Sequence, residues 1–244
     1  MRKEAEHRWY SSWFDTPYYH ILYKDRDKQE AQRFMDKLTS FLRLPVKAEI
    51  LDLACGRGRH SVYLNELGYR VMGVDLSLEN IKFARQFENE SLLFQQHDMC
   101  LPFPKQFDAV FNLFTSFGYF EAEEDNLRTI RSIKSELKKG GYGVIDFLNV
   151  AHVKQSFVTK ETKEVGGILF HIEKHMDTEH ITKRIQFEDD GQHFQFTEKV
   201  RALTLSDFES YFDKVEAQLL HCFGDYDLNP FNEENSERLI LIFN

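Results

Sequence analysis

The stretch ILDLACGRGRH, residues 50–60, places an aspartate and two glycines in the spacing D-x-x-x-G-x-G between a predicted strand and a predicted helix. The strand pattern is AEILDLA, and the helix pattern is HSVYLNEL, which Gly68 ends. Gly56 and Gly58 allow the backbone to approach a ligand closely, and the first turn of the helix presents N–H groups beside them. This order of residues predicts a ligand-binding turn.

The alternation of strand and helix patterns continues along the chain to residue 148. We expect strands at residues 69–75, 92–98, 107–114 and 142–148, with Ser77 as the N-cap of one connecting helix. Successive β-α-β units form right-handed crossovers, so this order predicts a doubly wound, mostly parallel α/β sheet.

Two further helices are predicted around this core. One lies ahead of the glycine turn, where apolar residues at helical spacing run from Ala31 to Leu42 and Pro45 closes the element. The other begins at Asp125 and ends at two consecutive glycines, 140 and 141. Its inward-facing residues are Leu127, Ile130 and Leu137.

The pattern changes after Asn149. Residues 168–177, 180–189 and 193–203 are predicted as strands of a small antiparallel β insertion, with a tight turn at Asp190 and Gly191. Ser206 and Glu209 form an S-x-x-E capping box that predicts the start of another helix. The last strands, 215–223 and 238–243, should form an antiparallel pair.

No repeat or low-complexity linker divides the sequence, so we expect a single domain over residues 1–244. Its segments would be an N-terminal aromatic and helical lid (1–45), a cofactor-binding core (46–150), the antiparallel insertion (151–203) and a C-terminal helix with a strand pair (204–244). The insertion is expected either to cover the site or to form a homodimer.

Composition narrows the class of function. A formal net charge of −9 disfavours nucleic acid, whose binding proteins usually display a basic stripe. Three widely spaced cysteines suggest neither a disulfide framework nor a zinc knuckle. No apolar run has the length of a membrane span, and MRKEAEHRWY lacks the apolar core of a signal peptide, so a cytoplasmic protein without membrane contact is expected.

Acidic residues accompany three successive predicted strands. Asp52 precedes the glycine turn, Asp75 ends the next strand nineteen residues after Gly56, and Asp98 ends the third. Ligands of open α/β sheets bind outside the carboxyl ends of the strands, where a carboxylate can accept hydrogen bonds from ribose hydroxyls. The three acids and the glycines therefore predict one nucleoside-binding crevice.

Several motifs, in this order, resemble those of class I S-adenosylmethionine-dependent methyltransferases over roughly residues 48–149: LDLACGRGRH, GVDLS, QHDM, FDAVFNLFTSFGYF and LKKGGYGVIDF. The resemblance implies a seven-stranded Rossmann-like sheet whose last strand is antiparallel. It also implies S-adenosyl-L-methionine as the cofactor. The strands after residue 149 loosely resemble the substrate-covering insertion of sugar-amine N-methyltransferases and other small-molecule members.

The resemblance assigns roles to ten residues around the methyl donor. Four would face its methionine part and sulfonium, two would hold the ribose and flank the adenine, two would address the adenine edge, and two would offer oxygen atoms to its amino group. In that order they are Asp52, Ala54, Gly56 and Gly58; Asp75 and Leu76; Asp98 and Met99; and Asn112 and Leu113.

Methyl transfer from a sulfonium depends mainly on alignment and on the exclusion of water, so dedicated catalytic groups can be few. A nitrogen or oxygen of a small molecule is the expected acceptor, and an oxygen acceptor would also need a base. NLFT at residues 112–115 differs from the N-P-P-Y or D-P-P-Y element of amino-group methylases that act on nucleic-acid bases. The candidate residues on the acceptor side are Tyr18, Tyr19, Tyr119 and His152, with packing of a lid as the alternative role.

Other interpretations remain open at this point. An NAD-dependent oxidoreductase would explain the glycines and Asp75, but Ser61 stands where a dinucleotide fingerprint has its third glycine. A non-catalytic S-adenosylmethionine-binding regulatory or partner protein is the other alternative. No metal site is predicted, because HIEKH has its glutamate at the wrong offset for a zinc motif and its histidines are expected to be solvated.

Overall fold

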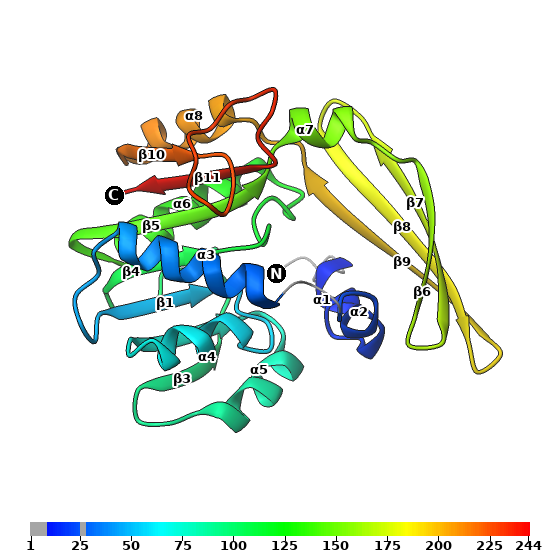
Figure 1. Cartoon of the computed structure of the whole chain (residues 1–244), viewed down its shortest axis with the longest axis horizontal. Helices are drawn as coiled ribbons and strands as arrows, with labels where there is room; N and C mark the ends of the chain where they lie inside the picture. Colours follow the sequence, from blue (N-terminus) through cyan, green and yellow to red (C-terminus); the bar gives the residue numbers. More distant parts are fainter. Residues whose placement is uncertain (1–8, 25–27) are drawn as a thin grey trace, which may run out of the picture. The chain divides into compact units, whose positions relative to one another are not determined.

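The computed structural model describes residues 9–24 and 28–244 and divides the chain into two compact units (Figure 1). The smaller unit takes the residues up to 26 together with 154–202, and the larger unit takes residues 27–153 and 203–244. The first helices therefore group with the predicted insertion, whereas the sequence treats residues 1–45 as one segment.

The larger unit is built on a seven-stranded sheet with the order β10-β11-β5-β4-β1-β2-β3. Neighbouring strands from β1 to β5 run parallel, while β11 is antiparallel to both β5 and β10. This confirms the predicted α/β class, with its mostly parallel seven-stranded sheet and antiparallel last strand. The strands are β1 (Glu49–Leu53), β2 (Arg70–Asp75), β3 (Leu92–Gln96), β4 (Phe107–Asn112), β5 (Leu137–Leu148), β10 (Leu219–Phe223) and β11 (Arg238–Phe243).

Helices cover both faces of this sheet (Figure 1). On one face, α3 (Lys28–Phe41), α4 (Arg59–Glu66) and α5 (Leu78–Ala84) share a buried core with the strands, in which Phe34, Leu64 and Ile81 meet Ile50 and Phe111. The short helix η1 (Arg85–Phe87) extends α5. Phenylalanine rings of α8 (Leu205–Val215) pack on phenylalanine rings of the strands. Helix α8 also contacts α6 (Glu123–Ser135). Helix α7 (Val150–Gln155) follows β5.

Two helix boundaries differ from the sequence prediction. The predicted helix from Asp125 to the glycines ends at Ser135, and Leu137 already belongs to β5. Gly140 has a φ of +77° inside β5, so the glycines accommodate an irregularity of the strand rather than a helix end. The predicted capping box at Ser206 and Glu209 is also wrong.

Thr204 and Asp207 form the capping box that starts α8. The Asp207 carboxylate accepts the backbone N–H of Thr204 at 2.7 Å, and the Thr204 hydroxyl accepts the backbone N–H of Asp207 at 3.4 Å. Threonine with aspartate satisfies the same two N–H groups as the predicted serine and glutamate, but two residues earlier. The predicted N-cap at Ser77 is confirmed, because its hydroxyl accepts the N–H of Asn80 at 3.0 Å.

The smaller unit contains a four-stranded antiparallel sheet: β6 (Lys160–Val165), β7 (Ile168–Met176), β8 (His180–Asp189) and β9 (Gln192–Arg201), with helices α1 (Trp9–Trp13) and α2 (Pro17–Leu22). Trp13 and Leu22 from the helices are buried against Phe170 and Ile185 of the sheet. The predicted turn at residues 190 and 191 is confirmed between β8 and β9. Strand β6 was missed because KETKEV is polar up to its last residue. Within the described residues, no helix has both the length and the apolarity needed to cross a membrane.

Candidate functional site

The glycine turn connects β1 to α4. Gly56 and Gly58 have φ values of +57° and +81°, in the left-handed region that favours glycine. A Cβ atom on Gly58 would lie 2.6 Å from the Phe94 ring, whereas one on Gly56 would meet no atom within 4 Å. Packing therefore requires the second glycine, and the first keeps open space in front of the turn. Ala54 also has a positive φ, of 65°.

Asp75 is the last residue of β2 and is fixed against this turn. Its two carboxylate oxygens accept the backbone N–H groups of Gly56 and Ser77, each at 2.8 Å. A carboxylate oxygen has two lone pairs and can accept more than one hydrogen bond. The structure thus holds an acidic group at the carboxyl end of β2, directly beside the glycine turn.

Asp52 lies inside β1 and is buried. Burial raises the pKa of its carboxyl from 3.8 to about 6, and the nearby charge of Asp75 adds to this effect. The hydroxyl of Ser61 donates to the Asp52 carboxylate at 2.5 Å and opposes the shift by stabilising the ionised form. Ser61 is therefore a site residue that the sequence prediction missed, although it lies on the helix that follows the glycine turn.

The ends of β1, β3 and β4 are joined through Asn112. Its side-chain amide donates to the carbonyl of Leu53 at 3.0 Å and lies 3.8 Å from the sulfur of Met99. Its side-chain oxygen is buried and has no hydrogen-bond partner among the described residues. Asp98, just after β3, accepts the N–H of Cys100 at 3.0 Å. Leu76 accepts from the Gln96 amide at 2.9 Å, and Leu113 is buried.

The predicted cofactor-side residues therefore lie in or just after four neighbouring strands, β4, β1, β2 and β3. Parallel strands bring their carboxyl ends to one edge of a sheet, and this explains why residues from position 52 to position 113 meet there. The fold and the local spacing together account for this grouping.

His60 and Phe114 lie face to face beside the turn. Their ring centroids are 4.4 Å apart and their planes differ by 18°. A guanidinium N–H of Arg59 lies 2.9 Å from Nε2 of His60, and a guanidinium can only donate, so that nitrogen accepts. The first turn of α4 is thereby connected to the segment that follows β4.

The four predicted acceptor-side residues belong to different units. Tyr119 and His152 are in the larger unit, and the Tyr119 hydroxyl donates to the carbonyl of Thr115 at 2.6 Å. Tyr18 and Tyr19 are in the smaller unit. The Tyr18 hydroxyl donates to Asp189 at 2.9 Å, and this hydrogen bond raises the pKa of the phenol.

An ion pair in the larger unit was missed by the sequence prediction. Arg238, the first residue of β11, donates to one carboxylate oxygen of buried Asp146 in β5, with nitrogen-to-oxygen distances of 2.8 and 2.7 Å. The Tyr226 hydroxyl donates to the other oxygen at 3.2 Å, and burial followed by the Asp146 charge raises the pKa of that phenol. A charged residue inside the apolar run VIDF and another at the start of RLILIF are the signal that could have revealed the pair.

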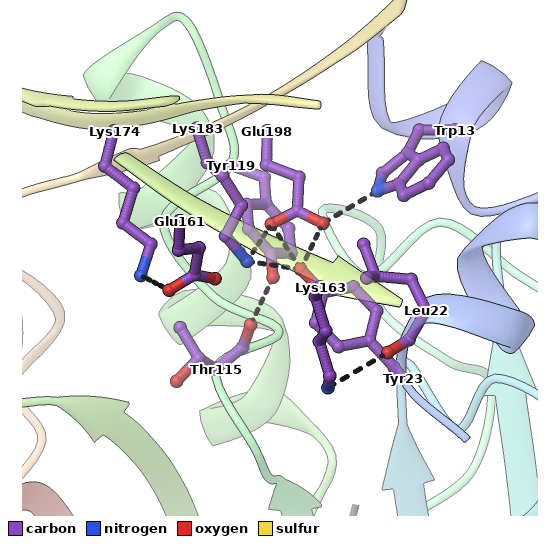
Figure 2. A network of polar contacts seen from close by, with 10 residues as sticks. All are labelled: Trp13, Leu22, Tyr23, Thr115, Tyr119, Glu161, Lys163, Lys174, Lys183 and Glu198. Carbon is purple, nitrogen blue, oxygen red and sulfur yellow. Dashed lines mark hydrogen bonds and ion pairs between the residues drawn. The ribbon is translucent and has the colours of Figure 1, made fainter. Parts of the chain in front are cut away.

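A second missed cluster lies in the smaller unit. Figure 2 shows the Glu198 carboxylate between the indole of Trp13, the hydroxyl of Tyr23 and the ammonium group of Lys183. The oxygen atoms accept from Trp13 Nε1 at 2.7 Å and from Tyr23 at 2.8 Å, and they lie 3.3 Å from Lys183 Nζ. Lys183 also contacts the Tyr23 hydroxyl. The alternation in HFQFTEKV places Glu198 on the same face as two phenylalanines, which could have marked it as buried.

Three histidines of the small sheet have exposed side chains. His171 and His175 are exposed on β7, and His193 is exposed on β9. Within residues 9–24 and 28–244, no group of three or more His, Cys, Asp or Glu side chains is arranged to hold a metal ion.

Comparison with known proteins matches residues 51–145 to the methyltransferase domain family. YqeM of Bacillus subtilis (strain 168), which has a methyltransferase name, is 42% identical over 107 residues, or 42% of this chain and 43% of that protein. The dTDP-3-amino-3,4,6-trideoxy-alpha-D-glucopyranose N,N-dimethyltransferase of Streptomyces venezuelae is 28% identical over 52% of this chain and 54% of that protein. The chain thus spans about half the length of these curated relatives.

A solved S-adenosylmethionine-dependent methyltransferase from Clostridium acetobutylicum ATCC 824 has the same fold, with a TM-score of 0.78 at 21% identity over 93% of this chain and 95% of that one. The chain thus has the α/β fold of solved S-adenosylmethionine-dependent methyltransferases. Residues 51–145 match the methyltransferase domain family that the sequence motifs resemble.

Proposed function

We propose that this chain transfers a methyl group from S-adenosyl-L-methionine to a nitrogen or oxygen atom of a small molecule. The observation that carries the proposal is the position of Asp75, which the N–H groups of Gly56 and Ser77 hold beside the glycine turn. A carboxylate at the end of the second strand suits the two hydroxyls of a ribose.

The neighbouring residues fit the rest of an adenosylmethionine molecule. The buried side-chain oxygen of Asn112 has no partner among the described residues, and it could accept a hydrogen bond from the amino group of the methionine part. Gly56 leaves space in front of the turn, and the first N–H groups of α4 follow it. Ionised Asp52 and Asp75 would favour a cation nearby.

When bound, S-adenosylmethionine supplies an activated methyl group that leaves its sulfur in an in-line displacement. The residues of this chain would then act mainly by holding the two reactants in line and by excluding water, which is worth up to roughly 7–11 kcal/mol in favourable intramolecular models. A neutral amine acceptor needs no base in that step. An oxygen acceptor would need one, and the candidates remain Tyr18, Tyr19, Tyr119 and His152.

A small molecule bearing an amine is the acceptor that we favour. The Streptomyces venezuelae relative is named for N-methylation of an amino sugar linked to dTDP. The net charge of −9 also suits a neutral or cationic acceptor better than nucleic acid. We further propose that the protein acts in the cytoplasm, and that the smaller unit either covers the acceptor or forms a homodimer.

Calorimetric titration with S-adenosylmethionine, S-adenosylhomocysteine and NAD tests the donor site. We expect the first two to bind and NAD not to bind. Asp75→Ala should weaken binding at least about tenfold, which equals about 1.4 kcal/mol. Asp75→Asn is the matched variant, because it keeps one acceptor oxygen for the turn. Unchanged binding in both variants would remove the ribose assignment.

The alternative is a non-catalytic protein that senses or binds S-adenosylmethionine, since a cofactor site does not guarantee chemistry. Incubation with methyl-labelled S-adenosylmethionine and a fractionated cell extract separates the two. An enzyme yields a labelled small molecule that mass spectrometry identifies, whereas a binding protein yields none while it still binds the donor.

A further inference from the structure

The ion pair of Asp146 and Arg238 lies at the carboxyl edge of the large sheet. Arg238 opens β11 opposite Leu148, the last residue of β5, and Asp146 lies two residues before that end. The side chain of Asp146 is 0% exposed and that of Arg238 is 19% exposed. Two charges are thus placed in the interior at the edge where the ends of β1, β2 and β4 form the donor site.

The pair holds two residues of the segment that follows β4. The Asp146 carboxylate accepts the backbone N–H of Phe114 at 2.7 Å, and the Asp146 carbonyl accepts the N–H of Thr115 at 3.0 Å. Arg238 donates to the Thr115 hydroxyl at 2.9 Å. Each polar group of the pair therefore engages the same short segment.

This segment has an unfavourable backbone conformation. Phe114 and Thr115 have φ values of 59° and 58°, and two consecutive left-handed residues without glycine are rare, above all when one is β-branched. Such a conformation persists only where surrounding contacts impose it. The hydrogen bonds that Asp146 accepts and Arg238 donates supply those contacts.

The conformation decides where the Phe114 ring lies. The ring faces His60 in α4 with centroids 4.4 Å apart, and it also contacts Tyr226 at 5.3 Å and Phe34 at 6.2 Å. Asn112, with its unpartnered oxygen, is only two residues before Phe114. The segment therefore connects the ion pair to both the glycine-turn helix and the end of β4.

Stability alone is a weak reason for such a pair. Removing two charges from water is costly, and well-packed apolar residues of similar size are often equally or more stabilising. A buried ion pair is better explained as a way to fix one backbone geometry, because apolar packing alone would let that geometry vary. Preorganisation of this kind is what a reaction based on alignment requires.

We infer that Asp146 and Arg238 are positioning residues of the methyl-donor site, which hold Phe114 and Thr115 so that the ends of β4 and the start of α4 keep their binding geometry. This inference rests on the proposed function, because it assigns the geometry to adenosyl binding. Neither residue needs to touch the donor for this role.

The test combines hydrogen exchange with calorimetry on the full chain. In Asp146→Asn and Arg238→Met, we expect amide exchange in residues 113–119 to become at least about tenfold faster, because the fixed N–H groups lose protection. We expect the affinity for S-adenosylhomocysteine to fall about fivefold or more in both. Arg238→Lys should restore part of both properties, since it keeps the charge but only part of the hydrogen bonding.

Lys138→Met is the matched control. Lys138 is also in β5 and forms ion pairs with Glu49 and Asp108 at 2.9 and 3.0 Å, but it lies at the opposite end of the strand. The Lys138→Met variant should keep the wild-type amide exchange of residues 113–119 and the wild-type affinity for S-adenosylhomocysteine. If Asp146→Asn does not fold, Arg238→Met and Arg238→Lys decide the matter, because they retain the carboxylate that holds Phe114.

The outcomes separate the inference from the proposed function. Variants that lose thermal stability but keep wild-type exchange at residues 113–119 and wild-type affinity show a purely structural pair and overturn the positioning role alone. Failure of the wild-type chain to bind either S-adenosylmethionine or S-adenosylhomocysteine overturns the proposed function, and the positioning role with it.

Discussion

The hydroxyl of Ser61 donates to the buried carboxylate of Asp52 across the start of α4, with an oxygen-to-oxygen distance of 2.5 Å. Charge-assisted hydrogen bonds of this length are among the stronger polar contacts in proteins. Here the bond stabilises an ionised group that burial and Asp75 destabilise. The candidate donor site thus contains a carboxyl whose pKa is raised to about 6 by burial.

We predict that Asp52→Asn changes how stability depends on pH. The pKa of Asp52 rises from 3.8 to about 6 on folding, so the neutral form contributes stability that is fully present below pH 3.8 and is lost as the pH rises through 6. The loss should be on the order of 2 to 3 kcal/mol and should be absent from the variant. Urea unfolding at several pH values between about 4 and 7.5 measures it.

Ser61→Ala serves as the comparison for this prediction. Without the hydroxyl, the pKa of Asp52 should rise further, and the loss of stability should extend to higher pH. If the free energies of unfolding of the wild type and of Asp52→Asn run parallel at all the pH values measured, Asp52 does not have a raised pKa.

The two glycines of the turn should behave differently when each is replaced by alanine. Gly58→Ala combines a left-handed φ with a Cβ 2.6 Å from the Phe94 ring, so we expect a loss of about 3 kcal/mol in the free energy of unfolding. Gly56→Ala adds a methyl group to open space and should cost only about 1 kcal/mol through its φ.

For Gly56→Ala, we expect ligand binding to be affected more than stability. Its new methyl group would occupy the space in front of the turn, so the affinity for S-adenosylhomocysteine should fall while the protein stays folded. Denaturant titration and calorimetry on the two variants give both quantities. Equal stability losses would mean that the Phe94 ring moves aside, and unchanged affinity in Gly56→Ala would place the ligand elsewhere.

The large sheet could be predicted from the sequence because its signals are local. Strands buried on both faces appear as apolar runs, and glycine or a capping residue separates them from the helices. The boundary between α6 and β5 could not be predicted, because Leu137 continues the apolar spacing of the helix while hydrogen bonding places it in a strand. Strand β6 lacked any apolar alternation and owes its place to pairing with β7.

The candidate site likewise has a part that could be predicted from the sequence and a part that could not. The predicted cofactor-side residues lie within short motifs at strand ends, so the fold and the local spacing together bring them to one edge of the sheet. Asp146 and Arg238 are 92 residues apart in the sequence, and Trp13 and Glu198 are 185 residues apart. Single-residue patterns indicate that such polar groups are buried, but they do not indicate which partner each one meets.

Glu136 should give a second pH-dependent contribution to the free energy of unfolding. Burial raises its pKa from 4.5 to about 7, although it accepts the N–H of Phe103 at 2.7 Å. The neutral form contributes stability below pH 4.5 that is lost as the pH rises through 7. We expect Glu136→Gln to unfold at a higher temperature than the wild type at about pH 8 and to lose this advantage at about pH 4.

Glu49 provides a control of opposite sign for Glu136. Hydrogen bonds from Lys105 and Lys138 lower the pKa of Glu49 to about 2, so its contribution is present above pH 4.5 and is lost as the pH falls towards 2. Glu49→Gln should therefore approach wild-type stability at acidic pH, where Glu136→Gln has lost its advantage. Identical pH profiles for the two variants would contradict both assignments.

Glu198 should be the most sensitive polar residue of the smaller unit. Its carboxylate satisfies the indole N–H of fully buried Trp13 and the hydroxyl of Tyr23, and it faces the ammonium group of Lys183. Glu198→Ala would leave a buried donor and a largely buried cation without this acceptor, so we expect a loss on the order of 2 to 4 kcal/mol. Glu198→Gln keeps an acceptor oxygen and should lose less.

Hydrogen exchange locates the effect of this change. Because Trp13 and Tyr23 flank α2, Glu198→Ala should speed amide exchange in residues 13–23, while the seven-stranded sheet keeps its protection. Glu188→Ala is the matched control, since that glutamate lies on the neighbouring strand β8 and is exposed. Equal protection of residues 13–23 in the two variants would show that apolar contacts of Trp13 and Leu22 alone hold these helices on the sheet.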